Sequence, residues 1–243
     1  MPDSAALLDA WECGLRLPLP QRALLVLAAS FPEVSGTELA QMPLGARDAL
    51  LFDVREQLFG TALETVSTCP RCDERLEAAF SLADIRVPGP GAESGVQEID
   101  AGGHHIRFRL PATADVLAIP DGADGDAARA VLIGRCVIEA LDAAGNSVAP
   151  QALPSAAIPA ISAEMARADR QAIVDLALEC PACGHGFAAA FDIASFLMAE
   201  LHGWAQRLIA DVAVLARAFG WREADVLALS PARRQLYLEL AAR

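Results

Sequence analysis

The stretch CPACGHGFAAAFDIASF, residues 180–196, has a second copy in the same chain. Aligned without a gap, it falls on CPRCDERLEAAFSLADI, residues 69–85, and seven of the seventeen positions are identical. The shared positions include both cysteines and the proline of a Cys-Pro-x-Cys motif, and the phenylalanine that is Phe80 in one copy and Phe191 in the other. The duplication indicates that the two cysteine pairs serve one purpose.

Zinc explains why two pairs are needed, because it is bound tetrahedrally by four ligands, commonly cysteine thiolates. One Cys-x-x-Cys turn supplies two sulfurs and a second turn completes the shell. Each motif is flanked by apolar stretches that we expect to form strands, 63–68 and 76–82 in the first copy and 173–178 and 187–193 in the second. We therefore predict a split zinc-ribbon-like unit with one structural zinc ion per chain, held by Cys69, Cys72, Cys180 and Cys183.

Two other interpretations of the cysteines remain open. CPRC and CPAC resemble the dithiols of thioredoxin-like proteins, although neither stands at a strand-to-helix turn of a βαβ pattern. The motifs could also be metal-free knuckles with buried thiols. His185 could replace a thiolate, but a polar residue directed at the sulfurs is the favoured role. We expect Cys13 and Cys136, on apolar helix faces, to be inert core residues.

Composition excludes several classes of function. The 243 residues carry 32 acids and 19 basic residues, all of them arginine, for a net charge of −13. Nucleic-acid binding and docking on an anionic membrane both need basic clusters, so we expect neither, and a basic protein partner is favoured. The sequence starts with an acidic rather than a basic region, so we expect no secretory leader, and no apolar run approaches the ~20 residues that span a bilayer. We expect a cytoplasmic protein, in which thiols stay reduced.

Enzyme motifs are missing from the sequence. No His-x-Glu element accompanies a Pro-Cys-x-x-Cys, and there is no Gly-rich phosphate loop, nucleophile elbow or His-Glu-x-x-His. We therefore expect no catalytic residues, no organic cofactor and no small-molecule substrate.

Helices are expected to dominate, since the chain is rich in Ala and Leu. Helical patterns cover residues 4–14, 21–30, 45–59, 126–141 and 162–169, while 96–110 reads as a hairpin that turns at Gly102-Gly103. A long helix begins at Ile193 and ends before Gly220, and two short helices, 224–229 and 231–243, follow. The long helix carries an apolar stripe, which is either the buried face of the helix, the favoured interpretation, or an oligomer contact. The stripe consists of Ile193, Leu197, Leu201, Trp204, Leu208, Val212, Leu215 and Phe219.

These elements predict an α+β, mostly helical protein with the four-cysteine unit at its centre and a long C-terminal helix that packs on the N-terminal helices. The predicted segments are N-terminal helices (1–60), a first knuckle half (61–86), an inserted hairpin and helix lobe (87–165), a second knuckle half (166–192) and a C-terminal helical segment (193–243).

Several short motifs resemble one known family. The ending GWREADVLALSPARRQLYLEL (220–240) is similar to the C-terminal signature of the T4-type bacteriophage base plate protein family. Other matching pieces follow in the same order as in that family, and with the two knuckles they span nearly the whole chain: WECG (11–14), RALLVLA (22–28), PLGARD (43–48), REQLFG (55–60) and AAFDIASFLMAE (189–200).

The resemblance implies a non-enzymatic component of a phage tail base plate or a related contractile injection system, which binds other tail proteins as a hub component or as a transient assembly factor. No catalytic residues carry over from the family. A zinc-ribbon adaptor of nucleic-acid machinery is the alternative, and it would need a basic stripe. A Cys-x-x-Cys dithiol oxidoreductase, which would need an exposed cysteine of low pKa, is a more distant one.

Overall fold

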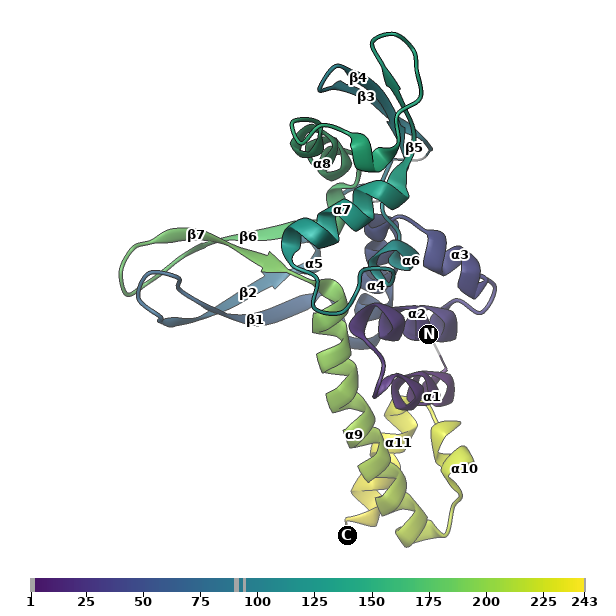
Figure 1. Ribbon diagram of the computed structural model, residues 1–243. Coiled ribbons are helices and arrows are strands. Elements are labelled where there is room, and N and C mark those ends of the chain that lie inside the picture. Colours follow the sequence, from purple (N-terminus) through teal and green to yellow (C-terminus); the bar gives the residue numbers. More distant parts are fainter. Residues whose placement is uncertain (1–2, 90–91, 94, 243) are drawn as a thin grey trace. The chain divides into compact units, whose positions relative to one another are not determined.

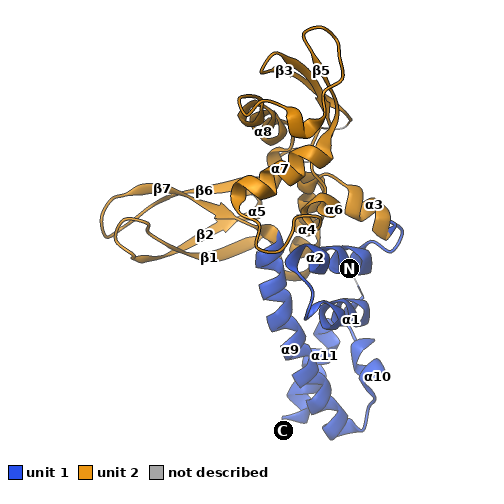
Figure 2. Ribbon diagram, in the orientation of Figure 1, with its two compact units in different colours: residues 1–35, 194–243 blue, residues 36–193 orange. Residues whose placement is uncertain are grey.

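The structure, a computed structural model, describes residues 3–89, 92–93 and 95–242. It divides into two compact units, one made of residues 1–35 and 194–243 and the other of residues 36–193 (Figure 2). Helices account for 53% of the structure and the sheets are small, so the predicted α+β, mostly helical fold is confirmed.

The first unit is all helical (Figure 1). It begins with α1 (Ser4–Gly14), capped by the Asp3 carboxylate, which accepts from the Ala5 amide. The other helices are α2 (Leu19–Ser30), the long α9 (Ile193–Phe219), the short α10 (Glu223–Leu227) and α11 (Pro231–Ala241). The last helix starts as predicted, with the Ser230 hydroxyl accepting from the Arg233 amide and a proline in the first turn.

The apolar stripe of α9 is largely a buried face. Leu197, Leu201 and Leu215 are fully buried, whereas Phe219 at the end of the helix is 40% exposed. Within the first unit, Ala205 and Leu208 form a small core with Leu8 of α1, and Trp11, Trp204 and Leu227 pack around it. The expected packing of the long helix on the N-terminal helices is therefore present.

The second unit holds both cysteine motifs. It begins with α3 (Gly36–Gln41), which no helical pattern predicted, and α4 (Leu44–Phe59). Two antiparallel hairpins follow at widely separated places in the chain, each with a Cys-x-x-Cys turn. The first is β1 (Ala62–Thr68) with β2 (Arg75–Ser81), followed by the one-turn α5 (Leu82–Ile85), and the second is β6 (Val174–Glu179) with β7 (Gly186–Phe191).

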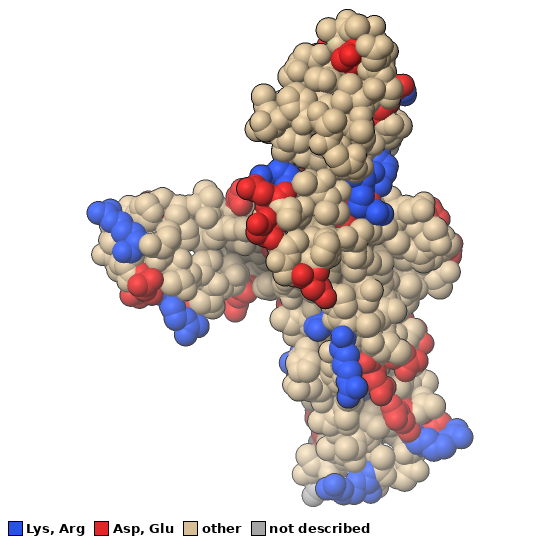
Figure 3. Space-filling view, viewed as in Figure 1, with Lys and Arg blue, Asp and Glu red and all other residues tan. Residues whose placement is uncertain are grey.

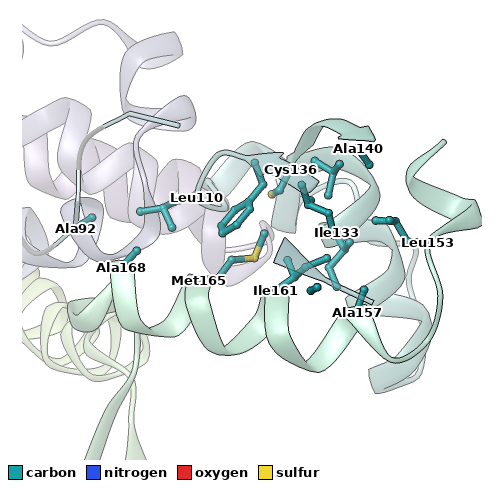
Figure 4. Close-up of a cluster of buried hydrophobic side chains, with 14 residues drawn as sticks. Ala92, Leu110, Ile133, Cys136, Ala140, Leu153, Ala157, Ile161, Met165 and Ala168 are labelled. Atoms are coloured by element: carbon teal, nitrogen blue, oxygen red, sulfur yellow. The ribbon is translucent and has the colours of Figure 1, made fainter. Parts of the chain in front are cut away.

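The inserted part of the second unit is a small α+β lobe. Its antiparallel sheet has the order β3 (Gln97–Ala101), β4 (His104–Phe108) and β5 (Val137–Asp142), and β3 and β4 are the predicted hairpin. Its helices are α6 (Thr113–Val116), α7 (Gly125–Cys136) and α8 (Ala157–Ala168), with 3₁₀ turns at Pro150–Ala152 and Arg170–Ala172. Met165 and Ile161 of α8 point toward Ile133 and Cys136 in its core (Figure 4).

The single helix predicted over residues 126–141 is wrong. The helix α7 stops at Cys136, and the chain continues as β5, in which Ala140 pairs with Ile106 of β4. Val137 and Ala140 are buried while Ile138 is 53% exposed, so this segment serves the sheet rather than a helix face. An apolar run followed by Val-Ile is compatible with a helix and with a strand, and the free edge of β4, with which the segment pairs, decides between them.

A buried carboxylate ties the lobe together. Asp115 in α6 is 1% exposed and accepts two hydrogen bonds from Arg109, at 2.6 and 2.9 Å, and one from Arg135 Nε at 2.8 Å. It also accepts from the Ala112 amide at 3.0 Å. Burial opposes its charge, but these bonds outweigh burial and lower the pKa of Asp115 to about 2.

A second buried carboxylate connects the start of α4 to the end of α8. Asp169 Oδ2 accepts from the Gly45 amide at 3.1 Å, and so supplies the side-chain cap that Pro43 cannot give. Glycine is required at position 45, because a Cβ there would lie 1.9 Å from Asp169 Oδ1. Within the described residues that oxygen has no hydrogen-bond partner. Burial raises the pKa of Asp169 to about 6, although the Gly45 bond and the charge of Arg47 oppose the rise.

The raised pKa of Asp169 predicts a pH dependence of stability. The folded protein holds this proton more tightly than the unfolded chain, whose pKa is near 3.8, so stability is highest below that pH and falls as the pH rises through about 6. A gap of roughly 2 between the two pKa values corresponds to about 3 kcal/mol. Urea unfolding at pH 4, 5, 6 and 7 measures the fall. Asp169→Asn should reduce this fall but not abolish it, because burial also raises the pKa of Asp48 to about 6. An unchanged profile would contradict the assignment.

Candidate metal centre

The two cysteine hairpins pack face to face. In each strand, half-buried or buried residues alternate with exposed ones, so one face of each hairpin is covered. Phe80 of β2 and Phe191 of β7 meet edge-to-face with their ring centres 5.8 Å apart, and Phe52 of α4 stacks on Phe191 at 6.4 Å. The two phenylalanines are the equivalent residues of the duplicated stretch, so both copies supply the same anchor at the base of the hairpins.

The turns at the far end of the hairpins have the same backbone geometry. In the first turn the Cys69 amide donates to Glu74 O and the Asp73 amide to Cys69 O. In the second, the Cys180 amide donates to His185 O and Gly184 donates to Cys180 O, which are the equivalent positions of the duplicated stretch. Asp73 and Gly184 both have positive φ, 59° and 66°, and Asp73 is the only non-glycine residue with positive φ in the described part of the chain. In the second copy this left-handed position is occupied by Gly184, and glycine is the residue that adopts the conformation most readily.

The turns bring four thiol groups together. The Sγ atoms of Cys69, Cys72, Cys180 and Cys183 all lie within 4.8 Å of one another. Cys69 Sγ is 3.8 Å from Cys183 Sγ, and Cys72 Sγ is 3.5 Å from Cys180 Sγ, so the close pairs join one hairpin to the other. All four are free thiols. Four sulfurs at ~2.3 Å from a central zinc ion would lie about 3.8 Å apart, so the cluster has the size of a tetrahedral zinc site and is close enough to bind a metal ion.

The electrostatics of the cluster favour a cation at its centre. Burial opposes ionisation of the Cys69 thiol, but hydrogen bonds from the Arg71 and Cys72 amides and from the neighbouring thiols outweigh burial and lower its pKa to about 7. The hydrogen bond from the Glu74 amide favours the Cys72 thiolate, yet the side-chain hydrogen bonds with Cys183 and Cys180 prevail and raise the pKa of Cys72. One thiolate therefore forms readily and makes the next harder to form. A divalent metal removes this conflict, since it binds thiolates and releases their protons.

The surroundings close the cluster on one side. Cys69 and Cys180 are buried with Leu76, and Phe187 packs against them, whereas Cys72 is exposed. His185 is not in the cluster, because its ring stacks on Phe187 at 6.2 Å and 12°. The expected role of His185 as a polar residue directed at the sulfurs is thus limited to its backbone amide, which hydrogen-bonds the Cys183 sulfur.

The two remaining cysteines behave differently from each other. Cys136 is a buried core residue, as predicted, and burial raises the pKa of its thiol to about 11, with the nearby Asp115 carboxylate acting in the same direction. The same prediction for Cys13 is wrong, because Cys13 is exposed on α1. The helix turns it outward and buries Leu7, Leu8 and Ala10 instead. Among the described residues, no second group of three or more His, Cys, Asp or Glu side chains could hold a metal ion.

Comparison with known proteins identifies the family. The model of the family described as "T4 bacteriophage base plate protein" matches residues 24–198, which is more than half of the chain. The chain belongs to this family. The match contains both knuckles and the inserted lobe but ends before the 220–240 motif, on which much of the sequence resemblance rested.

Two further comparisons were made for this base plate family protein, one with curated proteins and one with solved structures. No curated protein and no solved structure matches the chain. Among the described residues, no helix is both long enough and apolar enough to cross a bilayer, and this includes α9.

Proposed function

We propose that this protein is a non-enzymatic structural or assembly component of the base plate of a contractile, phage-like tail, stabilised by one zinc ion on Cys69, Cys72, Cys180 and Cys183. The observation that carries the proposal is the meeting of four free thiols within 4.8 Å in a chain of the T4 base plate family. Such a protein would be incorporated into the tail particle or would act while the particle is built.

The metal would act as a fold-stabilising cross-link. Four protein ligands fill the tetrahedral shell and leave no position for a substrate or water, which is the mark of a structural rather than a catalytic zinc ion. The ion would join two hairpins that lie far apart in the sequence, since Cys72 and Cys180 are 108 positions apart. It would thereby hold the two ends of the inserted lobe together while the outer faces of the molecule remain available to partners.

The charge distribution supports protein partners rather than nucleic acid. The net charge is −13, and arginine is the only strongly basic residue. On the face drawn in Figure 3, arginines are scattered among acidic side chains and form no continuous basic stripe. The adaptor of nucleic-acid machinery therefore lacks the electrostatic feature that it would need.

A dithiol oxidoreductase is the one alternative with a specific observation in its favour, the lowered pKa of Cys69. A nucleophilic cysteine also has to be accessible, and Cys69 is 0% exposed. The more exposed Cys72 has a raised pKa. The accessible thiol is thus the unreactive one, which favours the metal site over redox catalysis.

Metal analysis of the purified protein tests the proposal. We expect one zinc ion per chain by mass spectrometry, and its loss in Cys72→Ser and in Cys183→Ser, because each variant leaves a three-ligand site. Cys13→Ser, which changes an exposed thiol outside the cluster, is the matched control and should keep the metal. A metal-free protein whose thiols cycle between reduced and oxidised forms would contradict the proposal and support the oxidoreductase.

The base plate role has a separate test. The tagged protein, co-expressed with the genes that lie next to its own, should co-purify with sheath, tube, spike or other base plate proteins. Neighbouring genes for a sheath, a tube, a spike and an AAA ATPase would support the role. Their absence, together with co-purification of nucleic acid, would contradict it.

A further inference from the structure

A groove on the first unit is not explained by the metal centre. It lies between α1, α2 and the first half of α9 and has a volume of about 550 Å³. Its apolar wall includes Trp11, Leu15, Leu19 and Met198. Leu15 is 48% exposed, and the other three are only half-buried. A concave apolar surface left this open is characteristic of a site that another molecule covers.

Among the polar residues that line the same groove, His202 and Arg22 present hydrogen-bond donors. Trp11 Nε1 donates to His202 Nδ1 at 3.2 Å, so the ring proton of His202 is on Nε2. Arg22 Nε donates to Leu17 O at 2.7 Å, which fixes the guanidinium at the end of its stem. Gly14 lies beside that stem, since a Cβ at this position would be in van der Waals contact with Arg22 Cγ at 3.4 Å.

The remaining donors of Arg22 are unused. Within the described residues, its terminal guanidinium nitrogens have no hydrogen-bond or ion-pair partner. None of the residues that line the groove is Asp or Glu, although the chain has 32 acids against 19 arginines. The groove is therefore a place where an acidic protein presents an arginine without an acid to pair with it. An anionic group complements such a site.

We propose that this groove binds a segment of another protein in which a large apolar side chain stands beside a carboxylate. The apolar side chain would lie against Trp11, Leu15 and Met198, and the carboxylate would pair with Arg22. Tryptophan, methionine and arginine are among the residue types that are enriched in the centres of protein interfaces. The inference rests on the first unit alone and does not depend on the metal centre or on the base plate role.

The test uses two probes that differ only in charge, N-acetyl-leucine and its neutral amide, N-acetyl-leucinamide. Each is titrated into the full-length ¹⁵N-labelled protein while the indole N–H signal of Trp11, assigned with Trp11→Phe, is followed by NMR. Both probes should shift this signal, and the carboxylate should bind about fivefold more tightly, the effect of one exposed ion pair. Raising the salt concentration should remove that preference.

Variants separate the groove from the rest of the unit. Arg22→Gln should abolish the preference for the carboxylate, and Arg22→Lys should keep part of it. Arg217→Gln, which changes an exposed arginine of α9 outside the groove, is the matched control and should behave as the unaltered protein. Equal affinity for the two probes, or no shift of the Trp11 signal at tens of millimolar, would overturn the proposal. Self-association that Arg22→Gln abolishes would also overturn it, because the occupant would then be a second copy of the chain.

Discussion

Removal of the proposed zinc ion, or the substitution Cys180→Ser, is expected to lower the free energy of unfolding by about 4–5 kcal/mol, the value expected for a cross-link that closes a loop of roughly 100 residues. For a protein of this size such a loss corresponds to a fall in melting temperature of about 8–20 °C. The physical reason lies in the sequence separation, because Cys72 and Cys180 are 108 positions apart and the long segment between them must otherwise be ordered without this constraint.

The measurement is thermal unfolding followed by circular dichroism, with and without a chelator. The chelator and Cys180→Ser should have nearly the same effect, and the chelator should have none on Cys180→Ser, because both remove the same cross-link. Cys13→Ser should keep the melting temperature within about 1 °C of that of the unaltered protein, as expected for an exposed residue outside the core and the thiol cluster. A chelator that leaves the melting temperature unchanged would show that the thiol cluster contributes no metal-dependent stability.

The substitution Asp115→Ala is expected to destabilise the inserted lobe by about 2–4 kcal/mol. Breaking a buried ion pair costs about 3–5 kcal/mol. The value is lower here because Arg109 and Arg135, with side chains 41% and 44% exposed, regain water when the carboxylate is removed. The Ala112 amide also loses its acceptor. Urea unfolding at pH 7 measures the loss directly.

Acid provides an independent check on Asp115. Its pKa in the folded state, about 2, lies below the value of 3.8 that applies to the unfolded chain, so its stabilisation is fully present above pH 3.8 and is lost as the pH falls toward 2. The loss should be about 2 kcal/mol. It has the opposite direction to the effect of Asp169, and the two contributions together place the greatest stability near pH 4.

An exposed acid gives the matched control for Asp115. Asp126 in α7 forms an ion pair with Arg129, but its side chain is 91% exposed, and exposed pairs contribute about 0–1 kcal/mol. Asp126→Ala should therefore have little effect. Equal losses for Asp115→Ala and Asp126→Ala would mean that the buried network contributes no more than a surface pair.

Much of this protein could be predicted from the sequence because the decisive signals are local or repeated. The helices α1, α2, α4 and α9 follow from apolar spacing together with caps and breakers, and the turn of the β3–β4 hairpin follows from Gly102-Gly103. The duplicated motif predicted that Cys69, Cys72, Cys180 and Cys183 would meet, since a tetrahedral site needs two pairs. That they hold zinc remains a prediction.

Other features depended on partners that are distant in the sequence. Residues 137–142 form β5 rather than the end of a helix because β4 offers its free edge. Cys13 is exposed because the core of α1 selects Leu7, Leu8 and Ala10. The pairing of Phe80 with Phe191 joins two hairpins, and their identity in the duplicated stretch was the one signal that could have predicted it.

The buried carboxylates show most clearly that contacts between residues distant in the sequence cannot be predicted from local patterns. Nothing in the residues around Asp169 predicts that it caps a helix 124 positions earlier, or that Asp115 gathers Arg109 and Arg135 around it. Local propensity and periodicity report only on neighbours along the chain. Burial and charge pairing are properties of space, so tertiary structure alone decides which acid is raised in pKa, which is lowered and which arginine is left unpaired.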